Sequence, residues 1–308
     1  MIDGNNTLHR THWVANNTGR VLVNSKGVNT GSIFTFLKTV KSYVDQFNAS
    51  RIYVAWDRKL TTETNFRNTL TKGTYKGTRD QARNKEVYDS MGDILNSIEC
   101  LGIRNIFPGK LEADDVISWL GKTIPGKKII ISVDRDFIQL VTEDISYYNP
   151  IKKQLVDSHN FKETYEVDPK EYLYYKAIIG DVSDNITGIE GYGKVRGLKL
   201  AVSYNEYKKT GTCNEKDLEV IKNNIKIIED NLKLMDLSYG LEQFKEETEL
   251  YSEQLSILEH CTTDFDKFKQ ICVDLEFNSI IDRLSNWQST FNKKSNSNIL
   301  AEYFKAFV

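Results

Sequence analysis

The sequence predicts an α/β fold built on a parallel sheet, and three observations support this class. Short apolar runs alternate with longer stretches whose apolar residues recur at helical spacing, an order typical of parallel sheets. Two of the apolar runs end in an acidic residue, Asp57 after 53–56 and Asp134 after 129–133. The chain has 308 residues, enough to bury the core of one large domain or of two unequal ones.

The first third of the chain supplies a helix and a strand in turn. Apolar residues from 33 to 47 lie at helical spacing and predict an amphipathic helix. The run 51–56 predicts a buried strand that ends at Asp57. Residues 61–78 are polar, basic and interrupted by glycine, which indicates a loop or a loosely packed helical excursion. Two elements follow, a helix over 84–101 and a short strand over 103–107.

The next elements surround the most acidic part of the sequence. A helix begins at Glu112 and continues to about residue 122. Residues 128–133 are nearly continuously apolar, as expected of a central parallel strand, and Asp136 begins the following helix. Pro169 sits at a first-turn position, where proline is favoured, and predicts a helix through 179. The remaining elements are a Gly- and Asp-rich loop over 180–193, a helix over 194–204, and a Lys/Glu-rich helical region from 214 onward.

Composition excludes several classes of protein. The chain is 40% hydrophobic and 27% charged, a balance typical of globular rather than disordered chains. No apolar run reaches the ~18 residues of a membrane span, and residues 1–19 lack the apolar centre of a signal peptide. We therefore expect a cytoplasmic protein that does not enter a membrane. The four cysteines and four histidines share no metal-binding spacing, which argues against a soft-ligand metal centre.

Nine carboxylates lie at the edge of the predicted sheet where its strands end, or just beyond it, and two of them, Asp181 and Asp184, fall in the predicted loop over 180–193. Carboxylates gathered in one place repel unless a cation neutralises them. Oxygen ligands without Cys or His favour Mg²⁺ or Mn²⁺, and such a cluster suits two-metal hydrolysis of phosphodiesters. Each acid by itself could equally be a helix cap or a turn residue. The nine are Asp3, Asp57, Glu112, Asp114, Asp115, Asp134, Asp136, Asp181 and Asp184.

A basic stretch lies on a chain whose net charge is only −2. The stretch from Arg58 to Lys85 contains eight basic residues, Arg83 among them, and two acidic ones, so its net charge is about +6. Such a stretch can attract a polyanion. Lys76 and Arg79 would share one face of a helix, where they could hold charge on a scissile phosphate. A solvated basic face is the alternative. Tyr75 could stack on a base or pack internally.

A Gly-rich segment, 188–194, ends at a predicted helix start. Glycines let backbone N–H groups approach phosphate, and a helix N-terminus favours an anion. Lys194, Arg196 and Lys199 add positive charge there. An ordinary Gly-rich turn is the alternative explanation.

Taken in order, these motifs resemble the 5′-nuclease family of flap endonucleases and 5′–3′ exonucleases, especially the free-standing phage enzymes. The resemblance covers roughly residues 1–205. The matching segments are Ile2-Asp3-Gly4-Asn5-Asn6 with Arg10, Asp57 after a strand, Tyr75-Lys76-Gly77-Thr78-Arg79, Glu112-Ala113-Asp114-Asp115, Ser132-Val133-Asp134-Arg135-Asp136, Lys176 to Ile186, and Gly188 to Gly197.

The resemblance implies two domains. The first, over 1–168, is a PIN-like parallel-sheet nuclease body with an arch at about 60–90. The second, over 169–308, combines a DNA-binding helix-three-turn-helix at about 169–205 with a helical C-terminal region.

The same resemblance implies a role for each candidate residue. The nine acids would hold or position two or more Mg²⁺ ions, for which Mn²⁺ substitutes, and K⁺ at the helix-three-turn-helix is a further expectation. Lys76 and Arg79 would be catalytic, acting on the scissile phosphate. Nucleic-acid contacts would come from Arg10, Tyr75, Arg83, Lys176, Gly191, Gly193, Lys194, Arg196 and Lys199.

We therefore predict a monomeric, structure-specific 5′ nuclease of DNA replication or repair. Its partner would be branched or nicked duplex DNA with a 5′ end, or an RNA–DNA hybrid. One alternative is a non-catalytic module that binds branched DNA, and the full set of acids argues against it. A second alternative is a PIN-type ribonuclease, against which the Gly-rich segment argues.

Overall fold

The computed structural model describes residues 1–17, 21–58, 65–76, 85–258 and 262–292. Contacts divide the chain into two compact units. Unit 1 comprises Met1–Trp56, Asp80–Phe107 and Tyr251–Val308, and unit 2 comprises Asp57–Arg79 and Pro108–Leu250. The predicted domain boundary at 168/169 is a different division of the chain and stays a prediction.

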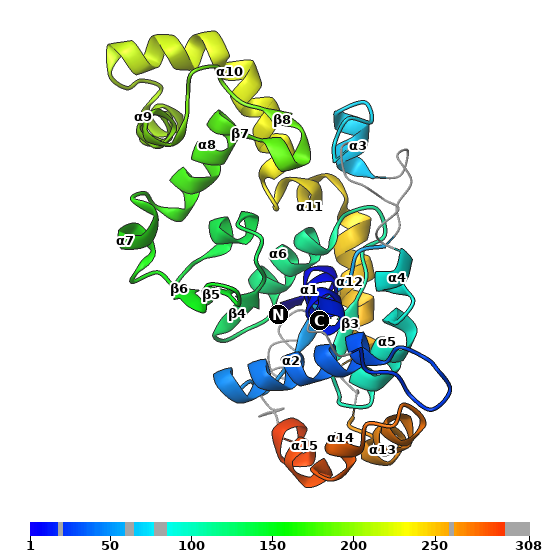
Figure 1. Ribbon diagram of the computed structural model, residues 1–308. Coiled ribbons are helices and arrows are strands. Elements are labelled where there is room, and N and C mark those ends of the chain that lie inside the picture. Colours follow the sequence, from blue (N-terminus) through cyan, green and yellow to red (C-terminus); the bar gives the residue numbers. More distant parts are fainter. Residues whose placement is uncertain (18–20, 59–64, 77–84, 259–261, 293–308) are drawn as a thin grey trace. The chain divides into compact units, whose positions relative to one another are not determined.

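Unit 1 contains three short parallel strands and several helices, which are labelled in Figure 1. Their order is β3-β2-β1, and the register pairs Asp3 with Ala55 and Ala55 with Ile106. The strands are β1 (Ile2–Asp3), β2 (Tyr53–Ala55) and β3 (Arg104–Ile106). The helices of this unit include α1 (Gly4–Asn17), α2 (Gly31–Phe47), α4 (Lys85–Tyr88), α5 (Met91–Glu99), α13 (Phe265–Asp274), α14 (Asn278–Ile281) and α15 (Leu284–Phe291).

Trp56 anchors the core of unit 1 directly after β2. It is fully buried, stacks on Phe36 of α2 at 5.7 Å between ring centroids, and donates from Nε1 to Asn105 Oδ1 at 2.8 Å. A Cβ at Gly4 would lie 2.5 Å from Trp56 Cε3, so glycine is needed where α1 begins against the indole. The burial of a large aromatic residue here stabilises the unit and fixes the end of β2.

Unit 2 contains a second set of strands. β4 (Lys128–Ile131) pairs in parallel with β5 (Ile145–Asn149), and β5 pairs antiparallel with β6 (Gln154–Val156). The register places Ile131 beside Tyr148. A short 3-10 helix, η2 (Asp136–Leu140), follows the carboxyl end of β4, with Asp136 as its first residue and Asp134 between the two elements.

Two helices of unit 2, α8 (Pro169–Ile179) and α9 (Lys194–Thr210), pack against each other and against α10 (Glu215–Met235), as Figure 1 shows. The link between α8 and α9 is a hairpin of β7 (Gly180–Asp181) and β8 (Ile186–Thr187) around the 3-10 turn η3 (Val182–Asp184). A Cβ at Gly188 would lie 2.1 Å from the carbonyl carbon of Ile179, so only glycine fits this crossing. Apolar side chains of the three helices form one core.

The other helices of the chain are short or lie toward its C-terminus. No helix within the described ranges is long and apolar enough to cross a membrane. These helices are α3 (Phe66–Leu70), α6 (Ala113–Thr123), α7 (Phe161–Tyr165), α11 (Tyr239–Gln243) and α12 (Lys245–Leu258).

Most predicted elements are present, with three corrections. The single helix expected over 84–101 is wrong, because a turn at 89–90 separates α4 from α5. The helix expected to begin at Asp136 is a 3-10 helix. The sheet is not purely parallel, because β6 runs antiparallel to β5. The polar N-terminal stretch also forms α1, which its composition did not indicate.

Candidate metal-binding active site

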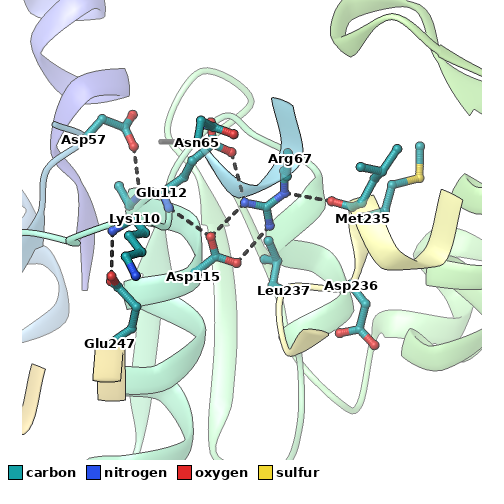
Figure 2. Close-up of polar contacts among 12 residues, drawn as sticks. Asp57, Asn65, Arg67, Lys110, Glu112, Asp115, Met235, Asp236, Leu237 and Glu247 are labelled. Carbon is teal, nitrogen blue, oxygen red and sulfur yellow. Dashed lines mark hydrogen bonds and ion pairs between the residues drawn. The ribbon is translucent and has the colours of Figure 1, made fainter. Parts of the chain in front are cut away.

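The acidic site of unit 2 begins at the N-terminus of α6. Glu112 is the N-cap residue of this helix, and Asp114 and Asp115 lie in its first turn, where the helix dipole favours negative charge. The backbone N–H of Ala113 donates to Asp57 Oδ1 at 2.7 Å, which joins the acid after β2 to this helix. Four of the predicted acids therefore meet at one helix end, as Figure 2 shows for three of them.

Asp115 is held by a buried arginine that the sequence did not single out. Arg67 of α3 is 3% exposed and Asp115 is 0% exposed, and the guanidinium makes two hydrogen bonds of 2.8 Å to the carboxylate oxygens. Arg67 Nε also donates to the carbonyl of Leu234 at 2.8 Å, and Nη1 lies 3.1 Å from Glu112 Oε2 (Figure 2). Both oxygens of Asp115 are thus engaged by a charge-assisted, bidentate pair.

Two residues of the predicted arch converge on Glu112. Lys76 Nζ lies 2.9 Å from Glu112 Oε1, and the Tyr75 hydroxyl donates to Oε2 at 3.1 Å. Burial alone would raise the pKa of Glu112, but Lys76 and Arg67 outweigh it and lower the pKa to about 2. These two cations therefore favour the ionised form of Glu112.

Lys76 is held by its backbone as well as by its side chain. Its N–H donates to the carbonyl of Asp184 at 3.2 Å, and its φ of 53° is in the left-handed region, which a non-glycine residue adopts at some cost. Its ammonium lies 4.8 Å from the centre of the Tyr75 ring. Tyr75 itself is 6% exposed and belongs to the core around α8 and α10, which agrees with the internal-packing alternative for this residue.

A second lysine sits among the acids that follow β4. Lys176 of α8 forms ion pairs with Asp136 Oδ1, at 3.2 Å, and with Asp181. Burial and the neighbouring charge of Asp134 raise the pKa of Asp136 to about 6, even though Lys176 opposes the shift. Burial would lower the pKa of Lys176, but Asp136 and Asp181 raise it. Lys176 therefore lies within the acidic site, and its predicted contact with nucleic acid stays a prediction.

A narrow pocket connects these groups. The volume open to a water-sized sphere is ≈ 10 Å³, enough for about one water molecule. Arg67 and Tyr75 line the pocket on the α3 side. Four predicted acids from three separate segments also line it, Asp114, Asp136, Asp181 and Asp184, and apolar side chains complete the lining, Ile186, Leu234, Met235 and Leu237.

The donor set of this pocket fits a divalent metal ion. Its acids offer only oxygen, the ligand type that Mg²⁺ and Mn²⁺ prefer. Among the residues that the structure describes, no three acidic, His or Cys side chains converge as a ready-made metal cage. Lys76 and Lys176 instead neutralise carboxylates there, so a bound cation would compete with their ammonium groups.

The other predicted residues are placed as follows. Asp3 ends β1 in unit 1 and accepts from the N–H of Asn6 at 3.0 Å, as an N-cap does. Arg10 of α1 donates to the Tyr43 hydroxyl. Arg79 and Arg83 lie outside the described residues. Five candidates are exposed in the loop before α9 and in its first turns, namely Gly191, Gly193, Lys194, Arg196 and Lys199.

The fold is α/β, and the carboxylates of the pocket offer oxygen ligands of the kind that a divalent metal ion prefers. Residues 1–166 match the family model described as "5'-3' exonuclease, N-terminal resolvase-like domain". The chain is 31% identical over 213 residues to the 5'-3' exonuclease of Buchnera aphidicola subsp. Schizaphis graminum. This alignment covers 68% of this chain and 71% of the relative. The chain therefore belongs to the 5′–3′ exonuclease family, as its motifs predicted.

Solved structures agree on the fold. The flap endonuclease of bacteriophage T5, in a pseudo-enzyme–product complex with DNA and metal ions, aligns with a TM-score of 0.64 at 21% identity, over 84% of this chain and 98% of that one. Flap endonuclease-1 from Methanococcus jannaschii aligns with a TM-score of 0.50 at 14% identity, over 96% of this chain and 92% of that one. The predicted α/β, PIN-like class is thereby confirmed.

Proposed function

We propose that this chain is a structure-specific 5′ nuclease that hydrolyses phosphodiesters of DNA flaps, nicked duplexes or RNA primers. Family membership supports nuclease chemistry. The observation that carries the proposal is the pocket in which Asp114, Asp136, Asp181 and Asp184 meet from three separate segments. A protein that only binds DNA gains nothing from carboxylates that repel each other and the phosphates.

The acids of this pocket and of the α6 start would hold the metal ions. We assign this role to Asp57, Glu112, Asp114, Asp134, Asp136, Asp181 and Asp184 of unit 2. The metal-binding role of Asp3, which belongs to unit 1, stays a prediction from the sequence. Bound Mg²⁺ would supply an activated water and neutralise the leaving oxygen. We assign Asp115 a supporting role, because Arg67 engages both of its oxygens.

The two internal lysines would change partners during the reaction. Lys76 neutralises Glu112 in this structure, and although burial would lower the pKa of its ammonium group, the negative charges of Glu112, Asp114 and Asp184 raise it. If another cation neutralised Glu112, the ammonium group of Lys76 would be available to hold the negative charge that develops on the scissile phosphate. Arg79 would add a second cation. Lys176 would be released from Asp136 and Asp181 in the same way and turn toward the nucleic acid.

The loop before α9 would grip duplex DNA through its phosphates. A Cβ at Gly191 or Gly193 would meet no neighbouring atom, so backbone there is open to approach. The N-cap of α9 is Gly193, which offers no side-chain oxygen to the first N–H groups of the helix. Lys194, Arg196 and Lys199 are exposed beside this helix start. This supports a helix-three-turn-helix over 169–205, with K⁺ as a candidate ion in its loop.

Several finer points belong to the same proposal. The arch at 60–90 would carry Arg79 and Arg83 to the 5′ strand, and Arg10 would contact the nucleic acid from α1. Tyr75 would act from its buried position, by orienting Glu112. We expect a monomer that works in the cytoplasm on DNA or an RNA–DNA hybrid, with a nuclease body over 1–168 and a helical region over 169–308.

A 5′-labelled flap on duplex DNA, incubated with Mg²⁺ and separately with EDTA, tests the proposed function. We expect Mg²⁺-dependent release of a short labelled product near the junction. Binding without cleavage in Mg²⁺ would favour the non-catalytic module. Cleavage of single-stranded RNA in preference to the flap would favour the PIN-type ribonuclease.

A further inference from the structure

A buried glutamate from the C-terminal part of the chain holds the segment that leads into α6. Glu247 of α12 is 2% exposed. Its Oε2 accepts from the N–H of Gly109 at 2.9 Å, and its Oε1 accepts from the N–H of Lys110 at 2.6 Å. Figure 2 draws the contact between Glu247 and Lys110, which lies two residues before Glu112 in the chain.

The approach of this carboxylate depends on glycine. A Cβ at Gly109 would lie 2.5 Å from Glu247 Oε1 and 3.3 Å from a methyl group of Leu250. The carboxylate therefore reaches two successive backbone N–H groups only because residue 109 has no side chain. Two short hydrogen bonds from one rigid group fix both the position and the direction of the chain at this point.

The segment between Glu247 and the acids is short and packed on its other side. Leu111 is 1% exposed, and a Cβ at Gly240 of α11 would lie 2.9 Å from its Cδ2 atom. The same Cβ would lie 3.6 Å from Asp115 Oδ1. Residues 109–111 are thus clamped by α11 and α12, and the next residue is Glu112, so little freedom remains for the start of α6.

We propose that Glu247 is a positioning residue for the metal-binding carboxylates at the start of α6, Glu112 and Asp114. This inference rests on the proposed function. A buried carboxylate is a costly way to gain stability, and an apolar side chain would fill the same space at less cost. Its advantage is geometric, because metal ligands need partners that fix their orientation. It also gives the C-terminal region, which showed no motif, a role in the active site.

The test compares Glu247→Gln with the neighbouring Glu246→Gln in the full-length chain. Glu246 is 54% exposed on its side chain and pairs at 3.1 Å with the side chain of Lys110 rather than with its backbone. The first readout is the affinity for Mn²⁺ alone, without DNA, by electron paramagnetic resonance or calorimetry. We expect Glu247→Gln to lose roughly 10–100-fold in Mn²⁺ affinity and Glu246→Gln to resemble wild type. The second readout is cleavage, where kcat should fall while KM for DNA stays unchanged.

Three outcomes of this test would contradict either the role of Glu247 or the proposed function. Wild-type Mn²⁺ affinity in Glu247→Gln, with only a lower melting temperature, would overturn the proposal and leave Glu247 a purely structural residue. If Glu247→Gln fails to fold, Glu247→Asp keeps the charge but withdraws it by one methylene, and unchanged Mn²⁺ affinity in that variant would equally overturn it. Wild-type protein that neither binds Mn²⁺ nor cleaves DNA would instead refute the proposed function.

Discussion

Replacement of Arg67 by methionine should destabilise unit 2 severely. Arg67 and Asp115 are 3% and 0% exposed, and two hydrogen bonds of 2.8 Å join them. Methionine keeps an unbranched apolar stem but leaves the Asp115 carboxylate buried without its guanidinium, a change that costs about 3–5 kcal/mol. For a unit of this size, that corresponds to a melting temperature lower by roughly 6–20 °C.

Urea unfolding of the full chain measures this cost, with intrinsic fluorescence as the signal, since Trp119 of α6 lies in the affected unit. Asp115→Asn and the double variant complete a thermodynamic cycle. Because the double variant has no buried unpaired charge, we expect it to be more stable than additivity predicts, with a coupling of about 2–3 kcal/mol. A loss below about 1 kcal/mol for Arg67→Met, the level of an exposed ion pair, would refute the reasoning.

Four further predictions follow from the same contacts. Lys176→Met removes the ammonium that Asp136 and Asp181 share, so calorimetry should show tighter binding of Mn²⁺ to DNA-free protein, and weaker binding would contradict the assignment. Tyr75→Phe loses only the hydrogen bond to Glu112, so the free energy of unfolding should fall by about 1 kcal/mol while DNA affinity is unchanged. A large loss of DNA affinity would show that the hydroxyl contacts the substrate. Mn²⁺ should raise the melting temperature of wild type but raise that of Asp136→Asn much less, because the ion binds only the folded state; equal shifts would place the ion elsewhere. If six or more phosphates are contacted, DNA affinity in EDTA should fall by roughly 10³-fold between 50 and 200 mM salt, whereas a flat response would exclude the exposed lysines near α9 as the DNA-binding surface.

The acids could be predicted because their positions follow from strand ends and helix starts. The apolar run before Asp134 and the sequence around Glu112 mark a buried strand and a helix N-terminus, and the structure has β4 and α6 at these places. Carboxyl ends of parallel strands share one edge, so acids that follow such strands are expected near one another without any knowledge of loops. The Pro169 helix start was equally visible, because its signals are local.

The supporting contacts could not be predicted, because they join segments far apart in a polar sequence. Arg67 lies in a stretch without apolar periodicity and meets Asp115 across 48 positions. Glu247 lies in a Lys/Glu-rich helix that looks solvated, and its partners are 137 and 138 positions away. Lys176 did carry a signal, because a lysine among the apolar residues of α8 needs an acidic partner when that helix is buried.

The most direct test of the central claim is the single-turnover cleavage rate of Asp136→Asn on a 5′-flap DNA in Mg²⁺, measured beside its DNA affinity in EDTA. The variant replaces one carboxylate of the pocket by a neutral amide of the same size. If these acids hold the catalytic metal ions, the rate should fall by roughly 100-fold or more while the affinity for DNA is retained. A variant that cleaves at the wild-type rate would show that the acidic pocket is not the active site.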